Sequence, residues 1–203
     1  SKGLVGSEMC IRDSNYLIIL IFITLLSISC TENDNNSSTD GYDRSSLLSN
    51  VVDNIMIPAH QNFDSQLELF ESSVNSFGQD RSISNLELMQ NQFIEAYKAW
   101  QHIEMFNIGY AEEIFYASKM NIYPANITRI TQNINSENVD LDGNSNQFSA
   151  QGFPAVDYLL FGLGETNDQI LNVYDTDNNL TFGYLNLLVS KMVNNTNSVI
   201  NYW

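Results

Sequence analysis

The stretch that decides the fold of this chain is QGFPAVDYLLFGLG, residues 151–164. Gly152 is a turn residue suited to precede a helix. Pro154 falls near the first helical position, where the missing N–H of proline costs no hydrogen bond. We expect Asp157 to lie in the first helical turn, where a carboxylate interacts favourably with the positive end of the helix dipole. The stretch therefore predicts a short helix that begins close to Gly152.

Apolar residues fill most of this predicted helix. Those that recur at helical spacing are Val156, Leu159 and Leu160. Gly162 and Gly164 then end the element. A helix that is apolar on most sides is usually buried, and a buried carboxylate needs a partner. We therefore expect Asp157 to be enclosed by neighbouring helices.

The same stretch resembles the signature of the imelysin-like family of bacterial envelope proteins. That signature is Gly-x-His-x-x-Glu followed by Tyr/Phe-Leu-Leu-x-Gly. The matching residues are Gly152 and, in the tail, Tyr158, Leu159, Leu160 and Gly162. Pro154 stands in place of the histidine and Asp157 in place of the glutamate. The resemblance extends over residues 47–203, and it implies the family's fold more than its chemistry, because proline can neither bind a metal nor transfer a proton.

Composition and charge exclude some classes of partner. The chain has 203 residues, of which 43% are apolar, and this is enough for one packed domain. It carries 24 acidic and 8 basic residues, a formal net charge of −16. Such a chain repels phosphate backbones, so we expect no nucleic-acid partner. The acidity fits an extracytoplasmic protein or one that meets cations.

The N-terminal residues predict export and lipidation. Residues 1–14 resemble translated sequencing-adapter read-through at the end of a metagenomic gene; the alternative is a genuine disordered N-terminus. Residues 15–30 are typical of a lipoprotein signal peptide, since their apolar run is shorter than the about 20 residues of a transmembrane helix. We expect cleavage before Cys30 and lipidation of its thiol, with an uncleaved membrane anchor as the alternative. Residues 31–44 are polar and aperiodic and predict a flexible tether.

Helical periodicity predicts an all-α fold for the domain at 45–203, an up-and-down helical bundle with irregular connections. No long run alternates apolar and polar residues as a strand would. The expected helices are 45–77, 84–106, 126–134, the signature helix and 180–203, with a short helix or turn at 111–120 and loops at 136–146 and 165–179. The resemblance implies that this domain is the N-terminal bundle of an imelysin-like fold whose second bundle is incomplete, in a chain truncated at both ends.

Local signals refine these elements. Pro58 predicts a kink or break in the first helix. Ser84 is a plausible N-cap, with Glu87 three residues later as its capping-box partner. His60 is a candidate ligand, although a buried or solvated helical histidine is the commoner case. The Asp-Gly sequence in the loop 136–146 indicates turn chemistry rather than a calcium loop.

We expect a pocket near Asp157, where a metal or another ligand binds. The further candidates, placed by proximity in the family pattern, are Tyr158, Trp100, His102 and Glu104. The spacing also allows Glu95, Lys98 and His102 to form a surface network, which we favour over a site.

Three functions remain open. The first is a lipid-anchored envelope protein that binds a ligand or a hard divalent cation such as iron, without catalysis, through oxygen atoms of Asp157 and nearby tyrosines and acids. An iron-linked role is implied by the resemblance, because the family's domain also occurs in a periplasmic iron-uptake component. The second is a structural or scaffold module in which Asp157 accepts hydrogen bonds from a loop amide or a tyrosine hydroxyl.

The third function is a metallopeptidase, as the family's label implies. Pro154 removes the natural ligand for a catalytic metal, and we find no phosphate loop, nucleophile elbow or His-Glu-x-x-His pattern. We therefore expect a protein that is not an enzyme. The expected partners are the membrane, through Cys30, and iron-uptake or other envelope proteins. The expected place is the cell envelope, at the periplasmic or surface face of the outer membrane.

Overall fold

The computed structural model describes residues 41–136 and 138–202. The expectations for residues 1–14, for the signal peptide at 15–30 with its lipidated Cys30, and for most of the tether lie outside these residues. Residues from Arg44 onward form one compact unit. Every regular element of the described ranges is helical and none is a strand, which confirms the all-α prediction. None of these helices has both the length and the apolar composition needed to cross a membrane.

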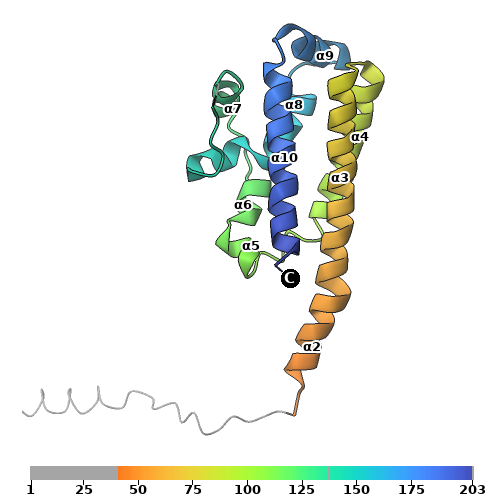
Figure 1. The fold of residues 1–203 in the computed structure, drawn as a ribbon, viewed down its shortest axis with the longest axis vertical. Helices are drawn as coiled ribbons and strands as arrows, with labels where there is room; N and C mark the ends of the chain where they lie inside the picture. The colour runs from red at the N-terminus through yellow and green to blue at the C-terminus, as the bar shows by residue number, and fades with distance from the viewer. Residues whose placement is uncertain (1–40, 137, 203) are drawn as a thin grey trace, which may run out of the picture. The chain divides into compact units, whose positions relative to one another are not determined.

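The elements follow the chain in one order (Figure 1). They are α2 (Arg44–Val51), the π-helix η1 (Val52–Met56), α3 (Ile57–Gln79), α4 (Ile83–Trp100), α5 (Tyr110–Glu113), α6 (Tyr116–Met120), α7 (Ile127–Ile134), the 3-10 helix η2 (Ser145–Ala150), α8 (Gly152–Phe161), α9 (Asn167–Thr176) and α10 (Leu180–Ile200).

Two long helices, α3 and α4, form an antiparallel hairpin (Figure 1). Each buries one apolar face, because its large residues recur every three or four positions. The buried residues of α3 include Phe63, Leu67, Phe70, Val74 and Phe77, and those of α4 include Leu86, Met89, Phe93 and Trp100. The hairpin corresponds to the first two expected helices, 45–77 and 84–106.

Two further helices complete the bundle. α10 runs alongside α3 in the opposite direction (Figure 1), and α8 packs against α10 and α4. The buried face of α10 includes Leu185, Leu188, Val189 and Met192, and that of α8 includes Ala155, Val156, Leu159 and Leu160. The core therefore lies between α3, α4, α8 and α10, and the up-and-down bundle is confirmed.

Pro58 interrupts the regular helix without ending it. It occupies the first turn of α3, directly after the π-helical turn η1. The backbone N–H of Ile57 bonds to the carbonyl of Val52, five residues back, in place of the usual four. The predicted break is thus a local change of hydrogen-bond register ahead of the proline.

Ion pairs and a turn hold the irregular connection between α7 and η2. The Asp140 carboxylate accepts hydrogen bonds from the backbone N–H groups of Asp142 and Gly143, at 3.0 and 2.9 Å. The Asp142 carboxylate pairs with Lys119 of α6 at 3.0 Å and with Lys191 of α10 at 2.5 Å. The Asp140 hydrogen bonds agree with the turn chemistry predicted from the Asp-Gly sequence, and the Asp142 ion pairs attach this turn to α6 and α10.

Several predicted boundaries are wrong. The stretch 165–179, expected to be a loop, contains α9, whose N-cap Thr166 accepts a hydrogen bond from the backbone of Gln169 and which buries Ile170 and Tyr174. The helix was missed because its apolar residues, Ile170, Leu171, Val173 and Tyr174, occupy little more than one turn between polar ends. The N-cap of α4 is Ser82 rather than Ser84, since its hydroxyl accepts from the backbone N–H of Asn85. α4 also ends at Trp100, before the predicted 106.

Candidate functional site

The position of α8 depends on Gly152, its first residue. Gly152 is buried and has a φ of +69°, a conformation that favours glycine. A Cβ atom at this position would lie 2.2 Å from the carbonyl oxygen of Met120 and 2.5 Å from that of Lys119. The chain therefore enters α8 in direct contact with the end of α6, and only glycine fits there.

Asp157 does not lie where the sequence suggested. Because α8 begins at Gly152, Asp157 is its sixth residue and belongs to the second turn, not the first. It is exposed, as is Phe161 one turn later. The neighbours Val156, Leu159 and Leu160 face the core, so the expectation that the acid is enclosed is wrong. Even this apolar helix keeps one narrow stripe that no other helix covers.

That stripe borders a cavity of about 430 Å³. Its walls come from α4, from α8, and from residues 123–127, which lie between α6 and α7 and include the first residue of α7. The lining residues are Phe93, Tyr97, Tyr123, Pro124, Ala125, Ile127, Phe153, Pro154, Asp157, Tyr158 and Gly162. We refer to it as the Asp157 cavity.

Aromatic rings line this cavity, and those of Phe93, Tyr97 and Phe153 are in mutual contact. The rings of Tyr97 and Phe153 lie 4.9 Å apart between centroids. Phe93 stacks on Tyr97 at 6.1 Å with an interplanar angle of 16°. Tyr158 lies across Gly162, where a Cβ atom would be 2.5 Å from its ring. The signature glycine at 162 thus makes room for the tyrosine ring of the same signature.

Asp157 is the one charged side chain among the residues that line the cavity. No hydrogen bond or ion pair joins it to another of the described residues. Partial burial against the apolar walls raises the pKa of Asp157 above its ordinary value. The cavity therefore presents a single carboxylate that the protein itself does not neutralise.

The other predicted site residues do not line this cavity. Trp100 is buried in the core between Phe63 and Tyr116, and its indole N–H has no hydrogen-bond partner among the described residues. Glu104 accepts a hydrogen bond from Asn121 at 3.1 Å. The structure thus brings together only Asp157 and Tyr158 of the five candidates.

His102, the remaining candidate, is exposed in the turn that follows α4. It borders a shallow depression together with Glu95 and Lys98. The Lys98 ammonium pairs with the Glu95 carboxylate at 2.7 Å, and both side chains are largely exposed. This arrangement agrees with the surface network that the spacing favoured.

His60, a further candidate, has a structural contact. It is buried on α3, and its Nδ1 donates a hydrogen bond to the carbonyl of Met56 at 2.8 Å. Burial lowers the pKa of His60. The histidine is therefore held neutral against the π-helical turn, which supports the interpretation as a buried helical residue.

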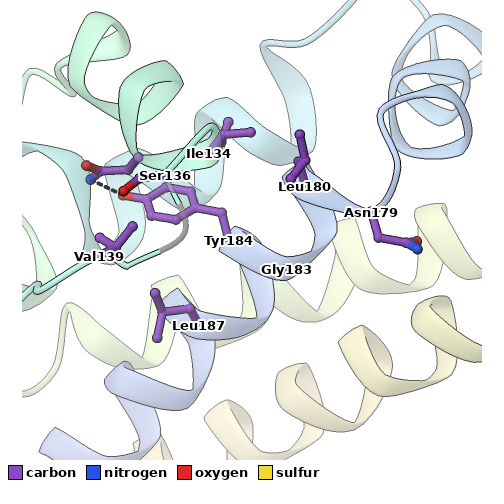
Figure 2. Close-up of a pocket in the computed structure, with 9 residues that line it drawn as sticks. Ile134, Ser136, Val139, Asn179, Leu180, Gly183, Tyr184 and Leu187 are labelled. Atoms are coloured by element: carbon purple, nitrogen blue, oxygen red, sulfur yellow. Dashed lines mark hydrogen bonds between the residues drawn. The ribbon is translucent and has the colours of Figure 1, made fainter.

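A second cavity of about 350 Å³ lies beside α10 (Figure 2). Tyr184 projects into it from α10, close to Ile134 and Ser136 (Figure 2). The polar groups here are satisfied, because the Asn133 amide donates to the Tyr184 hydroxyl at 3.0 Å and that hydroxyl donates to the carbonyl of Ala150. This cavity offers no unpaired charge, so the Asp157 cavity is the stronger candidate.

The Asp157 cavity does not fit the hard metal ion that the family resemblance implies. Such ions take about six oxygen ligands, several of them carboxylates. Across 41–136 and 138–202, no three His, Cys, Asp or Glu side chains converge to hold a metal ion. A lone carboxylate among tyrosine, phenylalanine and proline side chains is a poor donor set for a metal.

Sequence reasoning missed most of the aromatic wall. Tyr97 is not among the predicted site residues, yet it lies at the cavity with 38% of its surface exposed. Tyr123 also belongs to the wall, from a segment outside the expected helices, and Ile127 adds an apolar side chain from the helix expected at 126–134. The one available signal was Phe153, which lies inside the signature stretch next to Pro154.

Comparisons with known proteins agree with this fold. Residues 56–203 match the sequence profile of a family described as Imelysin (Peptidase_M75). The fold is similar to a crystal structure from Parabacteroides distasonis ATCC 8503 that is provisionally assigned as an iron-regulated protein A precursor, with a TM-score of 0.65 and 20% sequence identity. The match covers 78% of this chain and 44% of that one, so the chain spans less than half of that protein's length. No curated protein matches the chain in sequence.

Proposed function

Since this chain belongs to the imelysin family, we propose that it is a non-catalytic, lipid-anchored envelope protein that binds a small organic ligand in the Asp157 cavity. The observation that carries the proposal is the composition of that cavity. An aromatic and proline-lined hollow of about 430 Å³ with one convergent polar group has the size and character of small-molecule sites.

Export and anchoring rest on the sequence. The apolar run before Cys30 is typical of a lipoprotein signal peptide. The structural relative is described as a precursor, which supports export for this chain as well. That relative is also described as iron-regulated. For this chain we propose no bound iron ion, because the described residues do not fit a metal site. A connection with iron would then lie in the nature of the ligand or in how the protein's production is regulated.

Binding is favoured over the two alternatives. Hydrolysis needs a bound metal or a nucleophile with its base, and the lining residues of the Asp157 cavity supply neither. A purely structural Asp157 would accept a hydrogen bond from a loop amide or a tyrosine, and no described residue donates one to it. An unpaired carboxylate at a cavity is better suited to a ligand than to holding the fold.

The test uses a neutral fluorescent probe, N-phenyl-1-naphthylamine, whose emission rises in apolar sites. We expect the purified 203-residue chain to bind it, and Ala125→Phe, which fills the cavity from its wall, to weaken binding by about tenfold or more. The matched control is Gly183→Ala, which adds a methyl group beside the second cavity, where nothing lies within 4 Å. Equal binding by the original chain and by Ala125→Phe would contradict the proposal.

A further inference from the structure

The Asp157 cavity has a chemistry more specific than a general apolar site. We propose that its ligand is an organic cation: an ammonium group, quaternary or primary, carried on a small apolar body. This inference rests on the proposed function, because it names the ligand class of the same cavity. Three features of the described residues carry it: the aromatic wall, the unpaired carboxylate and the lack of any basic side chain in the lining.

The aromatic wall provides the attraction for a cation. Five aromatic side chains line the cavity, namely Phe93, Tyr97, Tyr123, Phe153 and Tyr158. The faces of such rings carry partial negative charge and attract cations within about 6 Å, and quaternary ammonium groups are commonly bound in cages of this kind. The packing of Tyr97 on Phe153 at 4.9 Å keeps two of the rings together at the cavity.

The carboxylate provides the opposite charge. Asp157 forms no ion pair with any described residue, and no lysine, arginine or histidine lines the cavity. A cationic ligand would supply the partner that the fold does not. Partial desolvation makes the isolated carboxylate less stable when ionised, and an adjacent ammonium group offsets this cost. The net charge of −16 also draws cations toward the chain and repels anions.

The remaining lining residues select an organic cation over a bare metal ion. Pro124, Ala125 and Ile127 form an apolar side of the cavity. They suit a hydrocarbon body, whereas a hydrated metal ion would gain nothing from them. A ligand with an ammonium group at Asp157 and a ring or short chain against these residues would bury both of its parts.

The experiment compares three ligands of similar size and different charge. They are benzyltrimethylammonium, benzyl alcohol and phenylacetate, each used to displace N-phenyl-1-naphthylamine from the purified 203-residue chain. We expect the cation to bind about tenfold more tightly than the neutral alcohol, and the anion to bind most weakly. Asp157→Asn, which keeps the size of the side chain, should remove most of the preference for the cation over the alcohol.

Two further variants sharpen the comparison. Tyr97→Leu, which keeps an apolar side chain but removes a ring, should weaken binding of the cation more than binding of the alcohol. Asp175→Asn, which removes an exposed carboxylate on α9 outside the cavity lining, should change neither affinity. A full effect of Asp175→Asn would show that only the overall charge matters, and it would overturn the inference.

The outcomes separate this inference from the proposed function. If the neutral probe binds the original chain but not Ala125→Phe, and the cation has no advantage over the alcohol, the ligand class is wrong and the cavity remains a binding site. The same conclusion follows if Asp157→Asn leaves the cation's affinity unchanged. If no compound binds the original chain, both the ligand class and the proposed function are wrong.

Discussion

Gly152 and Gly162 show how single residues of the signature act at the level of atoms. Gly152 has a positive φ and lies against the backbone of Met120. Gly162 lies under the ring of Tyr158, with no room for a Cβ atom. Close packing explains both glycines, that of Gly152 against the end of α6 and that of Gly162 against the Tyr158 ring. Their presence is therefore explained even though Pro154 stands in place of the signature histidine.

We predict that Gly152→Ala lowers the free energy of unfolding by at least about 2 kcal/mol, because the substitution adds a strained φ to a collision with the end of α6. Gly183→Ala is the matched control, since Gly183 lies inside α10 with open space around it. That change should leave stability equal or raise it by up to about 1 kcal/mol. Urea unfolding followed by circular dichroism measures both, and equal effects of the two substitutions would refute the steric explanation.

At the scale of elements, Arg81 links two connections between helices, the α3–α4 turn and the α9–α10 junction. It lies in the turn between α3 and α4, and its guanidinium donates hydrogen bonds to the carbonyl of Tyr174 and to the side chain of Asn179. The same group lies 5.2 Å from the ring centre of Phe182 on α10. One side chain thus holds the α3–α4 turn against the junction of α9 and α10.

We predict that Arg81→Ala lowers the free energy of unfolding by about 1–3 kcal/mol, because it removes two hydrogen bonds to a charged donor and a cation–π contact. Lys98→Ala is the control, since its ion pair with Glu95 lies in solvent. That change should cost no more than about 0.5 kcal/mol. Thermal or urea unfolding of the two variants gives the comparison, and a loss for Arg81→Ala as small as that for Lys98→Ala would count against the proposed role.

At the scale of the whole molecule, the free energy of unfolding depends on pH through carboxylates whose pKa values shift in opposite directions on folding. Burial, and then the charge of Glu68, raises the pKa of Asp64, and burial raises that of Asp157. Hydrogen bonding to Lys191 and Lys119 lowers the pKa of Asp142. The raised pKa values of Asp64 and Asp157 favour the folded state below the unfolded pKa of about 3.8. This contribution to stability is lost as the pH rises through the pKa that each group has in the folded state. The contribution of Asp142 is present above that pH and is lost on acidification.

Asp64 is the clearest case, because its Oδ1 is buried without a partner among the described residues. We predict that Asp64→Asn raises the free energy of unfolding at pH 7, where the ionised carboxylate opposes folding, and has little effect at pH 3, where the acid is protonated in both states. Asp175→Asn, on the exposed side of α9, should change stability by less than about 0.5 kcal/mol at both values. Unfolding curves at the two pH values decide the matter; a gain that is equal at pH 3 and pH 7 would mean that ionisation is not its cause.

The spacing of residues was sufficient to predict α3, most of α4, α8 and α10. Each carries large apolar side chains at helical intervals over at least two turns, and burial of such a face is favourable in any bundle. The signature stretch likewise identified the family, because its glycines and its Tyr-Leu-Leu run are read directly from the chain. α9 was missed because its four apolar residues are confined to positions 170–174, which is too short a run for helical periodicity to show. Which side chains of that helix are buried depends on the helices that pack against it, and the local sequence does not show this.

The environment of Asp157 was decided by tertiary structure alone. Periodicity shows which residues share a helix face, but it does not show which face the neighbouring helices leave uncovered. The Asp157 cavity is built from α4, from the segment around Tyr123 and from α8, which are far apart in sequence and meet only when α8 packs into the bundle. The sequence by itself determined a helical imelysin-family bundle with one acid in its most apolar helix. Only the packing of the helices placed that acid, unpaired, beside an aromatic cavity.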